Sequence, residues 1–346
     1  MKPALRTSLL SVLVAVALCA SAGSAVETEM TVVNAAAGID LGATLTMPAD
    51  GQPRAAVVLA SGSGAQNRDE EIMGFRPFKA IADYLGGRGY AVMRMDDRGI
   101  GLSSGDPLKT TLDDYVSDLG AAFAVLDSLL GRELPKGVIG HSEGGNAAVK
   151  LASANPSCGF IVTLAAPAWP GDSIIMSQAR AITEALAGTW EGEATQRHLL
   201  DMVKSDMSDM LLKNSIYYEL AVMSGPSAYA PEVQSQLLRT ASTMSSPSYR
   251  GRVRYNPAAD IAGVAVPWLA LNGDMDFQVL HANLEDIAAL NPSATTVTMS
   301  RHNHLFQRCT TGLPTEYATL VEDISPETLE TIADWLDALD GARNSR

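Results

Sequence analysis

The chain has 346 residues, of which 39 are acidic and 25 basic, so its formal net charge is −14. Nucleic acids and anionic membrane surfaces are bound by clustered cations, and this balance argues against both as partners. The one local basic cluster, residues 250–254, is short and is expected to form ordinary surface ion pairs.

The first 25 residues have the pattern of a signal peptide. A basic start is followed by an apolar run over residues 9–18, broken by one serine, and by small residues up to Ala25. The run is too short to span a bilayer comfortably, so we expect cleavage near Ala25, no stable membrane insertion, and a periplasmic or secreted protein. A lipid anchor on Cys19 is less favoured, because bulky Leu18 precedes it.

Without residues 1–25 the chain has 321 residues and a net charge of −16. Beyond residue 28, predicted strands and helices alternate. Strands are predicted at residues 30–33, 41–47, 55–60, 91–95, 137–139, 160–164, 267–271 and 295–299. Helices are predicted at residues 77–85, 111–130, 145–152, 281–290 and from Ser325 onward. Apolar strands that alternate with helices are typical of an α/β fold with a mostly parallel, doubly wound sheet.

Residues 168–260 interrupt this alternation, because they are almost free of strand patterns. They are predicted to form a helical cap inserted into an α/β core of residues 26–167 and 261–346. The cap follows the carboxyl end of a strand, where ligands bind in open α/β sheets. Two interpretations of its methionines stay open: packing between cap helices, or a deformable wall over a substrate. They are Met176, Met202, Met207, Met210, Met223 and Met244.

The stretch Gly140-His141-Ser142-Glu143-Gly144 is predicted to present a nucleophile. An apolar strand precedes it and a helical pattern follows, which is the strand–turn–helix setting of a nucleophile elbow. The glycines indicate that strand and helix approach too closely for a Cβ. The helix start behind Ser142 also offers free N–H groups where an oxyanion would form.

A serine nucleophile needs a base and an orienting acid, which follow it in the order acid, then histidine, in this type of fold. Asp276 is the favoured acid, and Asp274 is the alternative that could instead cap the turn. His304 is the favoured base because two apolar residues follow it and can pack its loop down. His302 has polar neighbours and is expected to be an exposed loop histidine.

The oxyanion hole is predicted to use two backbone N–H groups. One belongs to Glu143, and the other to Ser63 or, as the alternative, Gly62. His141 is expected to face the packing around the elbow. No cluster of residues has metal-ligand spacing, so no cofactor or metal is expected.

Cys158 and Cys309 are the cysteines outside the predicted signal peptide. We place Cys158 before the start of a strand, and Cys309 after the opposite edge of the sheet. A strand of five residues separates these edges by roughly 17 Å, which is beyond the reach of a disulfide. Two free, partly buried cysteines are therefore expected.

Five motifs occur in order: residues 61–64 with Asn67-Arg68-Asp69-Glu70, then 97–103, 140–145, 271–276 and 303–307. Together they resemble the exported bacterial α/β-hydrolases often labelled esterase, relatives of the dienelactone hydrolases and the prolyl-oligopeptidase-like hydrolases. The resemblance covers most of residues 28–340 and implies the α/β-hydrolase fold. It also implies a triad of Ser142, Asp276 and His304. The sequence departs from the family at Asn67, where Asp is expected, and at Ser248-Tyr249, where two aromatics are expected, which bears on substrate preference.

The sequence thus predicts an exported serine hydrolase that cleaves small-molecule carboxylic esters through an acyl-enzyme on Ser142. A peptidase or an acyl-thioesterase with the same triad is an alternative, although the sequence contains no evident clamp for a peptide carboxylate. A non-catalytic, hydrolase-like binding protein is the other alternative.

Overall fold

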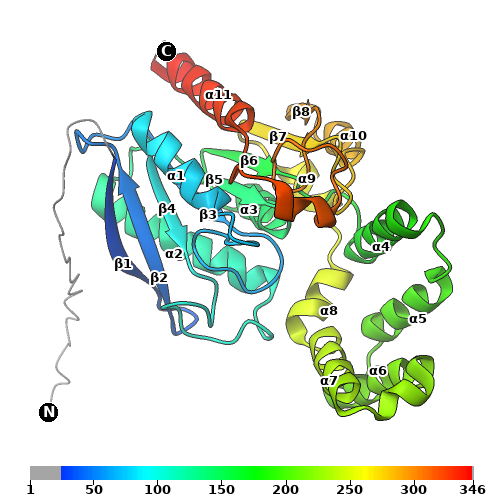
Figure 1. Cartoon of the computed structure of the whole chain (residues 1–346). Coiled ribbons are helices and arrows are strands. Elements are labelled where there is room, and N and C mark those ends of the chain that lie inside the picture. Colours follow the sequence, from blue (N-terminus) through cyan, green and yellow to red (C-terminus); the bar gives the residue numbers. More distant parts are fainter. Residues whose placement is uncertain (1–24, 345–346) are drawn as a thin grey trace, which may run out of the picture.

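The computed structural model describes residues 25–344 (Figure 1). The predicted signal peptide lies outside the described residues, apart from Ala25. Within them the strands form one sheet of eight, in the order β1-β2-β4-β3-β5-β6-β7-β8. β2 pairs antiparallel with β1 and β4, and the other neighbours pair in parallel. The strands are β1 (Val26–Asn34), β2 (Ile39–Met47), β3 (Ala56–Ala60), β4 (Ala91–Met95), β5 (Lys136–His141), β6 (Phe160–Leu164), β7 (Trp268–Gly273) and β8 (Thr295–Met299).

The sheet confirms the predicted mostly parallel α/β architecture. Every residue of β3 to β7 is buried, as expected for strands that helices cover on both faces. β1 is longer than the predicted 30–33, because it pairs with β2 along its whole length. The early positions of β1 alternate between exposed and half-buried, so they lack the apolar run that marks a central strand.

Helices cover the two faces of the sheet. α1 (Pro77–Gly87) and α11 (Pro326–Asn344) pack on one face. The other face is covered by α2 (Leu112–Leu130), α3 (Glu143–Ala154), α9 (Ala258–Gly263) and α10 (Asn283–Leu290). α2 begins where the sequence predicts, because the Thr111 hydroxyl accepts the backbone N–H of Asp114 in a capping box.

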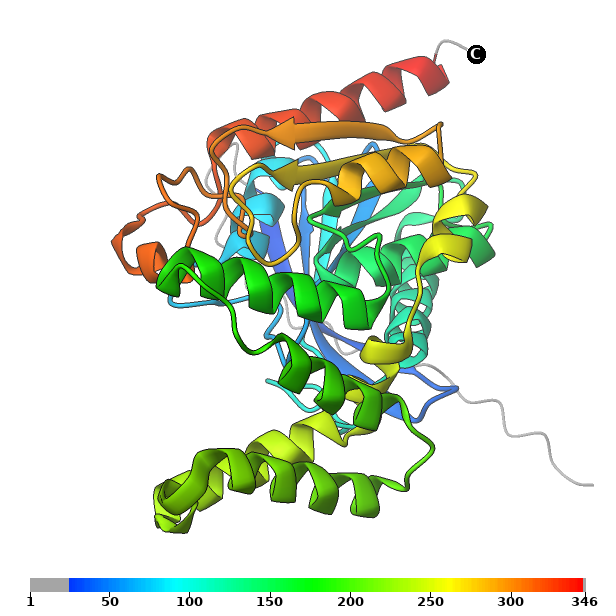
Figure 2. The ribbon, with the colours of Figure 1, turned by 90° about the vertical axis from the view of Figure 1, so that its right-hand side faces the viewer.

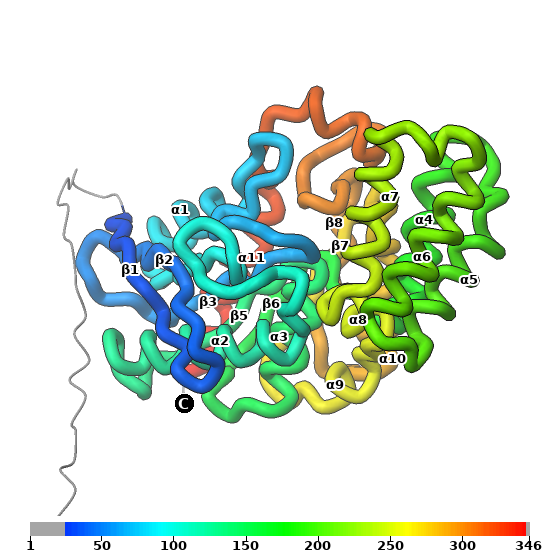
Figure 3. The backbone as a smooth tube through the Cα atoms, turned by 90° about the horizontal axis from the view of Figure 1, so that it is seen from below, coloured from blue at the N-terminus to red at the C-terminus, as the bar shows by residue number. Residues whose placement is uncertain are grey.

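A group of helices that follows β6 and precedes β7 in the chain stands beside the sheet. Figures 1 and 3 show α4 to α8 on the side of the molecule away from β1 and β2, and Figure 2 shows them from the front. They are α4 (Gly171–Ala187), α5 (Glu193–Lys204), α6 (Asp209–Ser224), the 3-10 helix η1 (Gly225–Tyr229), α7 (Pro231–Met244) and α8 (Pro247–Arg254). The expected cap boundaries, 168 and 260, stay a prediction.

These helices bury an apolar cluster of their own. Its fully or nearly buried members include Val203, Leu212 and Ile216. Four of the six methionines predicted for the cap pack against this cluster or belong to it: Met176, Met202, Met207 and Met244. The other two, Met210 and Met223, are exposed.

Cys158 and Cys309 are free and buried. Burial raises the pKa of the Cys158 thiol to about 12 and that of Cys309 to about 11. No helix within residues 25–344 is long and apolar enough to cross a membrane.

Candidate active site

Ser142 lies between the end of β5 and the start of α3 with φ 52° and ψ −119°, a conformation that residues with a side chain rarely adopt. Its N–H donates to Leu164 O at 2.8 Å, and its carbonyl accepts Gly145 N–H at 2.9 Å. A backbone held in such a region costs about 1–3 kcal/mol, which the surrounding bonds must offset. The strain raises the serine side chain above the sheet edge, as in a nucleophile elbow.

The glycines of the elbow are required by close backbone approach. A Cβ on Gly140 would lie 2.2 Å from Gly144 O, and one on Gly144 would lie 2.1 Å from Ala60 O. Both contacts are with backbone, which cannot rotate away as a side chain can. Any larger residue at either position would therefore push strand and helix apart.

His304 and Asp276 form a buried pair. His304 Nδ1 lies 2.7 Å from Asp276 Oδ2. The other carboxylate oxygen accepts the N–H groups of Gln278 at 2.7 Å and Val279 at 3.0 Å. A carboxylate held in this way fixes the imidazole with its proton on Nδ1, which leaves Nε2 free to accept a proton.

The His304–Asp276 pair lies next to the elbow. The ring of His141, the residue before Ser142, is 4.7 Å from the ring of His304, centroid to centroid. No hydrogen bond joins Ser142 Oγ to His304 among residues 25–344. Asp274, the alternative acid, instead accepts the N–H of Arg301 at 2.6 Å and holds the turn.

The expectation that His302 is exposed is wrong. Its exposed fraction is 0 %, and its Nδ1 lies 2.8 Å from Ser300 O while its Nε2 lies 2.7 Å from Ser325 Oγ. Of its two polar neighbours, Arg301 is exposed, but Asn303 is buried and its side chain bonds to Leu305 and Gln307. His302 therefore links the loop after β8 to the N-terminus of α11.

Glu70 organises the loop after β3. Its Oε1 accepts the N–H of Gly62 at 2.6 Å and lies 2.8 Å from His141 Nδ1. His141 Nε2 lies 2.9 Å from His304 O. Both nitrogens of His141 thus face acceptors. Burial is the largest single effect and lowers the pKa of His141, but the charge and hydrogen bond of Glu70, the His304 carbonyl and the charge of Asp276 together raise it above its usual value. Sequence reasoning quoted Glu70 only as part of a motif and gave it no role.

The bond to Glu70 occupies the N–H of Gly62, which leaves Ser63 as the better placed second oxyanion donor. Ser63 lines the same cavity as Ser142 and Glu143. Neither the Ser63 nor the Glu143 backbone N–H donates to another group in the described part of the chain. Two unpaired amides beside a serine are what an oxyanion hole requires.

A cavity of about 310 Å³ opens at Ser142. Its walls come from the segment after β6, from α4 and from α8, and include Trp169, Ile174, Ile175 and Tyr249. None of the cap methionines is among its described lining residues, so the interpretation of them as a wall over the substrate is wrong. Four of them pack within the cap, which has an apolar core of its own, and the other two face solvent.

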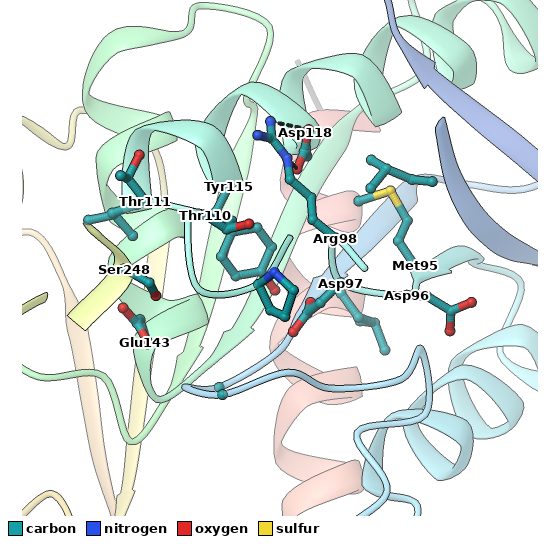
Figure 4. A pocket seen from close by; sticks show the side chains of 16 residues that line it. Met95, Asp96, Asp97, Arg98, Thr110, Thr111, Tyr115, Asp118, Glu143 and Ser248 are labelled. Carbon is teal, nitrogen blue, oxygen red and sulfur yellow. Dashed lines mark hydrogen bonds and ion pairs between the residues drawn. The ribbon is translucent and has the colours of Figure 1, made fainter. Parts of the chain in front are cut away.

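A smaller cavity of about 60 Å³ lies on the other side of Glu143. Figure 4 shows Glu143 beside Ser248, away from the ion pair of Arg98 with Asp118. Asp97 lines this cavity, where its carboxylate accepts hydrogen bonds from the Ser61 hydroxyl at 2.8 Å and from the N–H of Gln66 at 2.9 Å. Burial outweighs both bonds and raises the pKa of Asp97 to about 7.

The raised pKa of Asp97 predicts a pH-dependent stability. Above pH 4 the unfolded chain loses this proton while the folded chain keeps it until about pH 7, so the free energy of unfolding falls as pH rises through this window. Asp97→Asn keeps the shape without titrating. In urea unfolding at pH 4.5, 6 and 8, the free energy of unfolding of wild type should fall with rising pH relative to that of Asp97→Asn. A difference between the two free energies that does not change with pH would contradict the prediction.

The burial of His302 predicts a structural role for it. His302→Ala removes two buried hydrogen bonds and leaves a cavity, so the free energy of unfolding should fall by about 2–4 kcal/mol in chemical denaturation. His198, whose side chain is 59 % exposed, is the matched control. His198→Ala should change stability by less than about 0.5 kcal/mol. Equal unfolding midpoints for the two variants would count against this role.

Residues 51–215 match a family model described as "Serine aminopeptidase, S33". No curated protein matches the chain. An esterase from Pyrococcus furiosus is similar at 15% identity and a TM-score of 0.55, covering 91% of this chain and 93% of that one. A thermophilic esterase from Thermogutta terrifontis, solved with malate, has 18% identity, a TM-score of 0.53 and coverages of 91% and 99%. Est1E from Butyrivibrio proteoclasticus, solved with ferulic acid, has 16% identity and a TM-score of 0.53, covering 92% of this chain and 100% of that one.

At these identities the solved structures show the fold, and the family model adds the class of chemistry. The sheet order, the helices on both faces and the strained serine after β5 are the features of this chain that fit that fold. The chain therefore has the α/β-hydrolase fold, and the match to the family model over residues 51–215 supports a serine hydrolase.

Proposed function

We propose that the protein is an exported esterase that cleaves small carboxylic esters through an acyl-enzyme on Ser142. The observation that carries this proposal is the buried His304–Asp276 pair, with a 2.7 Å contact, beside a strained serine at the mouth of a 310 Å³ cavity. The esterases among the structural neighbours support ester substrates.

In the proposed mechanism Ser142 Oγ attacks the ester carbonyl carbon while His304 Nε2 takes the hydroxyl proton. Asp276 keeps the ring oriented and stabilises its positive charge. The N–H groups of Glu143 and Ser63 bind the oxyanion of the tetrahedral intermediate. His304 then returns the proton to the leaving alkoxide, so that an alcohol departs and an acyl-enzyme remains.

Deacylation repeats these steps with water as the nucleophile. His304 Nε2 accepts a proton from the water as its oxygen attacks the acyl carbon. Collapse of the second tetrahedral intermediate breaks the bond to Ser142 Oγ, which regains its proton from His304. A carboxylic acid leaves, and the free serine is restored.

A peptidase is the second candidate, favoured by the description of the matching family model. The same triad would also act on thioesters. A panel of short p-nitrophenyl esters, aminoacyl p-nitroanilides and acyl-thioesters separates the three classes. We expect the highest kcat/KM for an ester, and a clear preference for the anilides would favour the peptidase.

Replacing the nucleophile or the base should abolish ester hydrolysis. Ser142→Ala and His304→Ala should each lower kcat on a short p-nitrophenyl ester by about three orders of magnitude or more. His302→Ala, assayed where it is folded, should cost less than about tenfold. Near-normal turnover by Ser142→Ala would refute the proposal. Labelling of Ser142 by a fluorophosphonate would exclude a non-catalytic binding protein.

We also propose that the protein is periplasmic or secreted. The support is the sequence pattern of residues 1–25, a basic start followed by an apolar run and small residues. N-terminal sequencing of the protein recovered outside the cytoplasm of an expressing bacterium should begin near residue 26. An intact N-terminus in the cytoplasmic fraction would contradict export. A lipid on Cys19 would show that the protein is anchored to a membrane after export.

A further inference from the structure

Three arginines follow one another on α8, and two of them hold the cap together. Arg250 donates three hydrogen bonds, to the carboxylate of Asp209 and to the backbone carbonyls of residues 205 and 207. Arg254 donates two, to carbonyls of residues 204 and 205. Both fasten α8 to the end of α5 and the loop that follows. The structural role expected for the 250–254 cluster therefore holds for these two.

Arg252 is directed differently, because its side chain lines the cavity that contains Ser142. Its Nε is buried and has no hydrogen-bond partner. Among residues 25–344 its guanidinium makes one ion pair, at 3.5 Å, from Nη1 to Glu143 Oε2. The guanidinium carbon lies 5.0 Å from the ring centroid of Tyr249, which supports the group from one side.

The position of Glu143 leaves part of this guanidinium open. Glu143 approaches through Nη1, so the other edge, Nε and Nη2, has no partner among residues 25–344, and Nε itself is buried. That edge presents parallel donors at the spacing of the two oxygens of a carboxylate. The other polar groups of the cavity wall are uncharged and include Asn146, whose Oδ1 is buried without a partner.

The charge balance of the cavity selects among anions. Arg252 is the cation and Glu143 the carboxyl group among the described lining residues. Burial raises the pKa of Glu143, and Arg252 opposes this shift. One arginine that already faces a carboxyl group is poorly suited to a phosphate dianion, whereas a carboxylate carries one charge and matches the free edge.

We propose that the cavity binds esters that also carry a carboxylate, such as monoesters of short dicarboxylic acids, and that the Arg252 guanidinium binds this carboxylate. The inference rests on the proposed esterase function. Arg252 lies on the cavity wall shared with Ser142, so it would hold the far end of the acyl group while the ester lies at the serine. Arg252 is then a specificity-determining residue.

Two esters of equal chain length test this inference: ethyl hydrogen adipate, which carries a carboxylate, and ethyl hexanoate, which does not. Wild type should have a higher kcat/KM for ethyl hydrogen adipate. Arg252→Gln should lower the ratio of the two kcat/KM values by about 10- to 100-fold, mainly through KM, since it removes hydrogen bonds between charged groups. An unchanged ratio in a folded variant would overturn the inference.

Arg254→Gln is the matched control, because it removes a cation from the same helix outside the cavity wall. It should keep the ratio within about twofold. A fall in the ratio equal to that of Arg252→Gln would mean that the net charge of the cap, and not a carboxylate contact, sets the preference.

Binding to an inactive enzyme separates this inference from the proposed function. Ser142→Ala should bind ethyl hydrogen adipate in calorimetry, and Ser142→Ala with Arg252→Gln should bind it at least about tenfold more weakly. If wild type hydrolyses neither ester but this difference persists, the esterase proposal fails and the carboxylate site stands. If wild type hydrolyses ethyl hexanoate but the two inactive variants bind ethyl hydrogen adipate equally, the site fails and the esterase proposal stands.

Discussion

The arrangement of the active site depends on one buried carboxylate, that of Glu70. A single oxygen of this group holds the N–H of Gly62 and the ring of His141, and that ring reaches the backbone of His304. The loop after β3, the elbow and the loop that carries His304 are thus connected through one residue. A buried charge that loses its partner is costly, so these three loops are expected to keep their mutual positions as a unit. Glu70 itself has φ 51°, and the same contacts hold it in that unusual conformation.

Most of the fold could be predicted because its central strands are buried on both faces. Such strands are near-continuous apolar runs, and those predicted at 91–95 and 160–164 have the observed bounds. The elbow was predictable for a steric reason, since Gly140 and Gly144 contact backbone that has no space for a Cβ. The neighbours of each strand were not predictable, because periodicity marks an element and carries no information on what it pairs with. The placement of β4 between β2 and β3 is such a case.

The candidate site shows where sequence reasoning reaches its limit. Order along the chain and apolar neighbours pointed to His304, which the structure brings to Asp276. The same reasoning misjudged His302, because polar neighbours suggest solvent whether or not the folded chain satisfies them internally. Arg252 was hidden in a similar way. It stands between two arginines that hold the cap, and only the direction of its side chain distinguishes it from them.

The two cysteines have a practical consequence for studying the cap. Burial keeps both thiols almost entirely protonated at neutral pH, and the thiolate is the form that reacts with electrophiles and exchanges with disulfides. The two native cysteines of the folded chain are therefore expected to react little with thiol-specific labels. A cysteine introduced at an exposed cap position such as Met223, which is 57% exposed, could carry a fluorophore without removal of Cys158 or Cys309. Such a fluorophore would report on the surroundings of α6 in a protein whose core is unaltered.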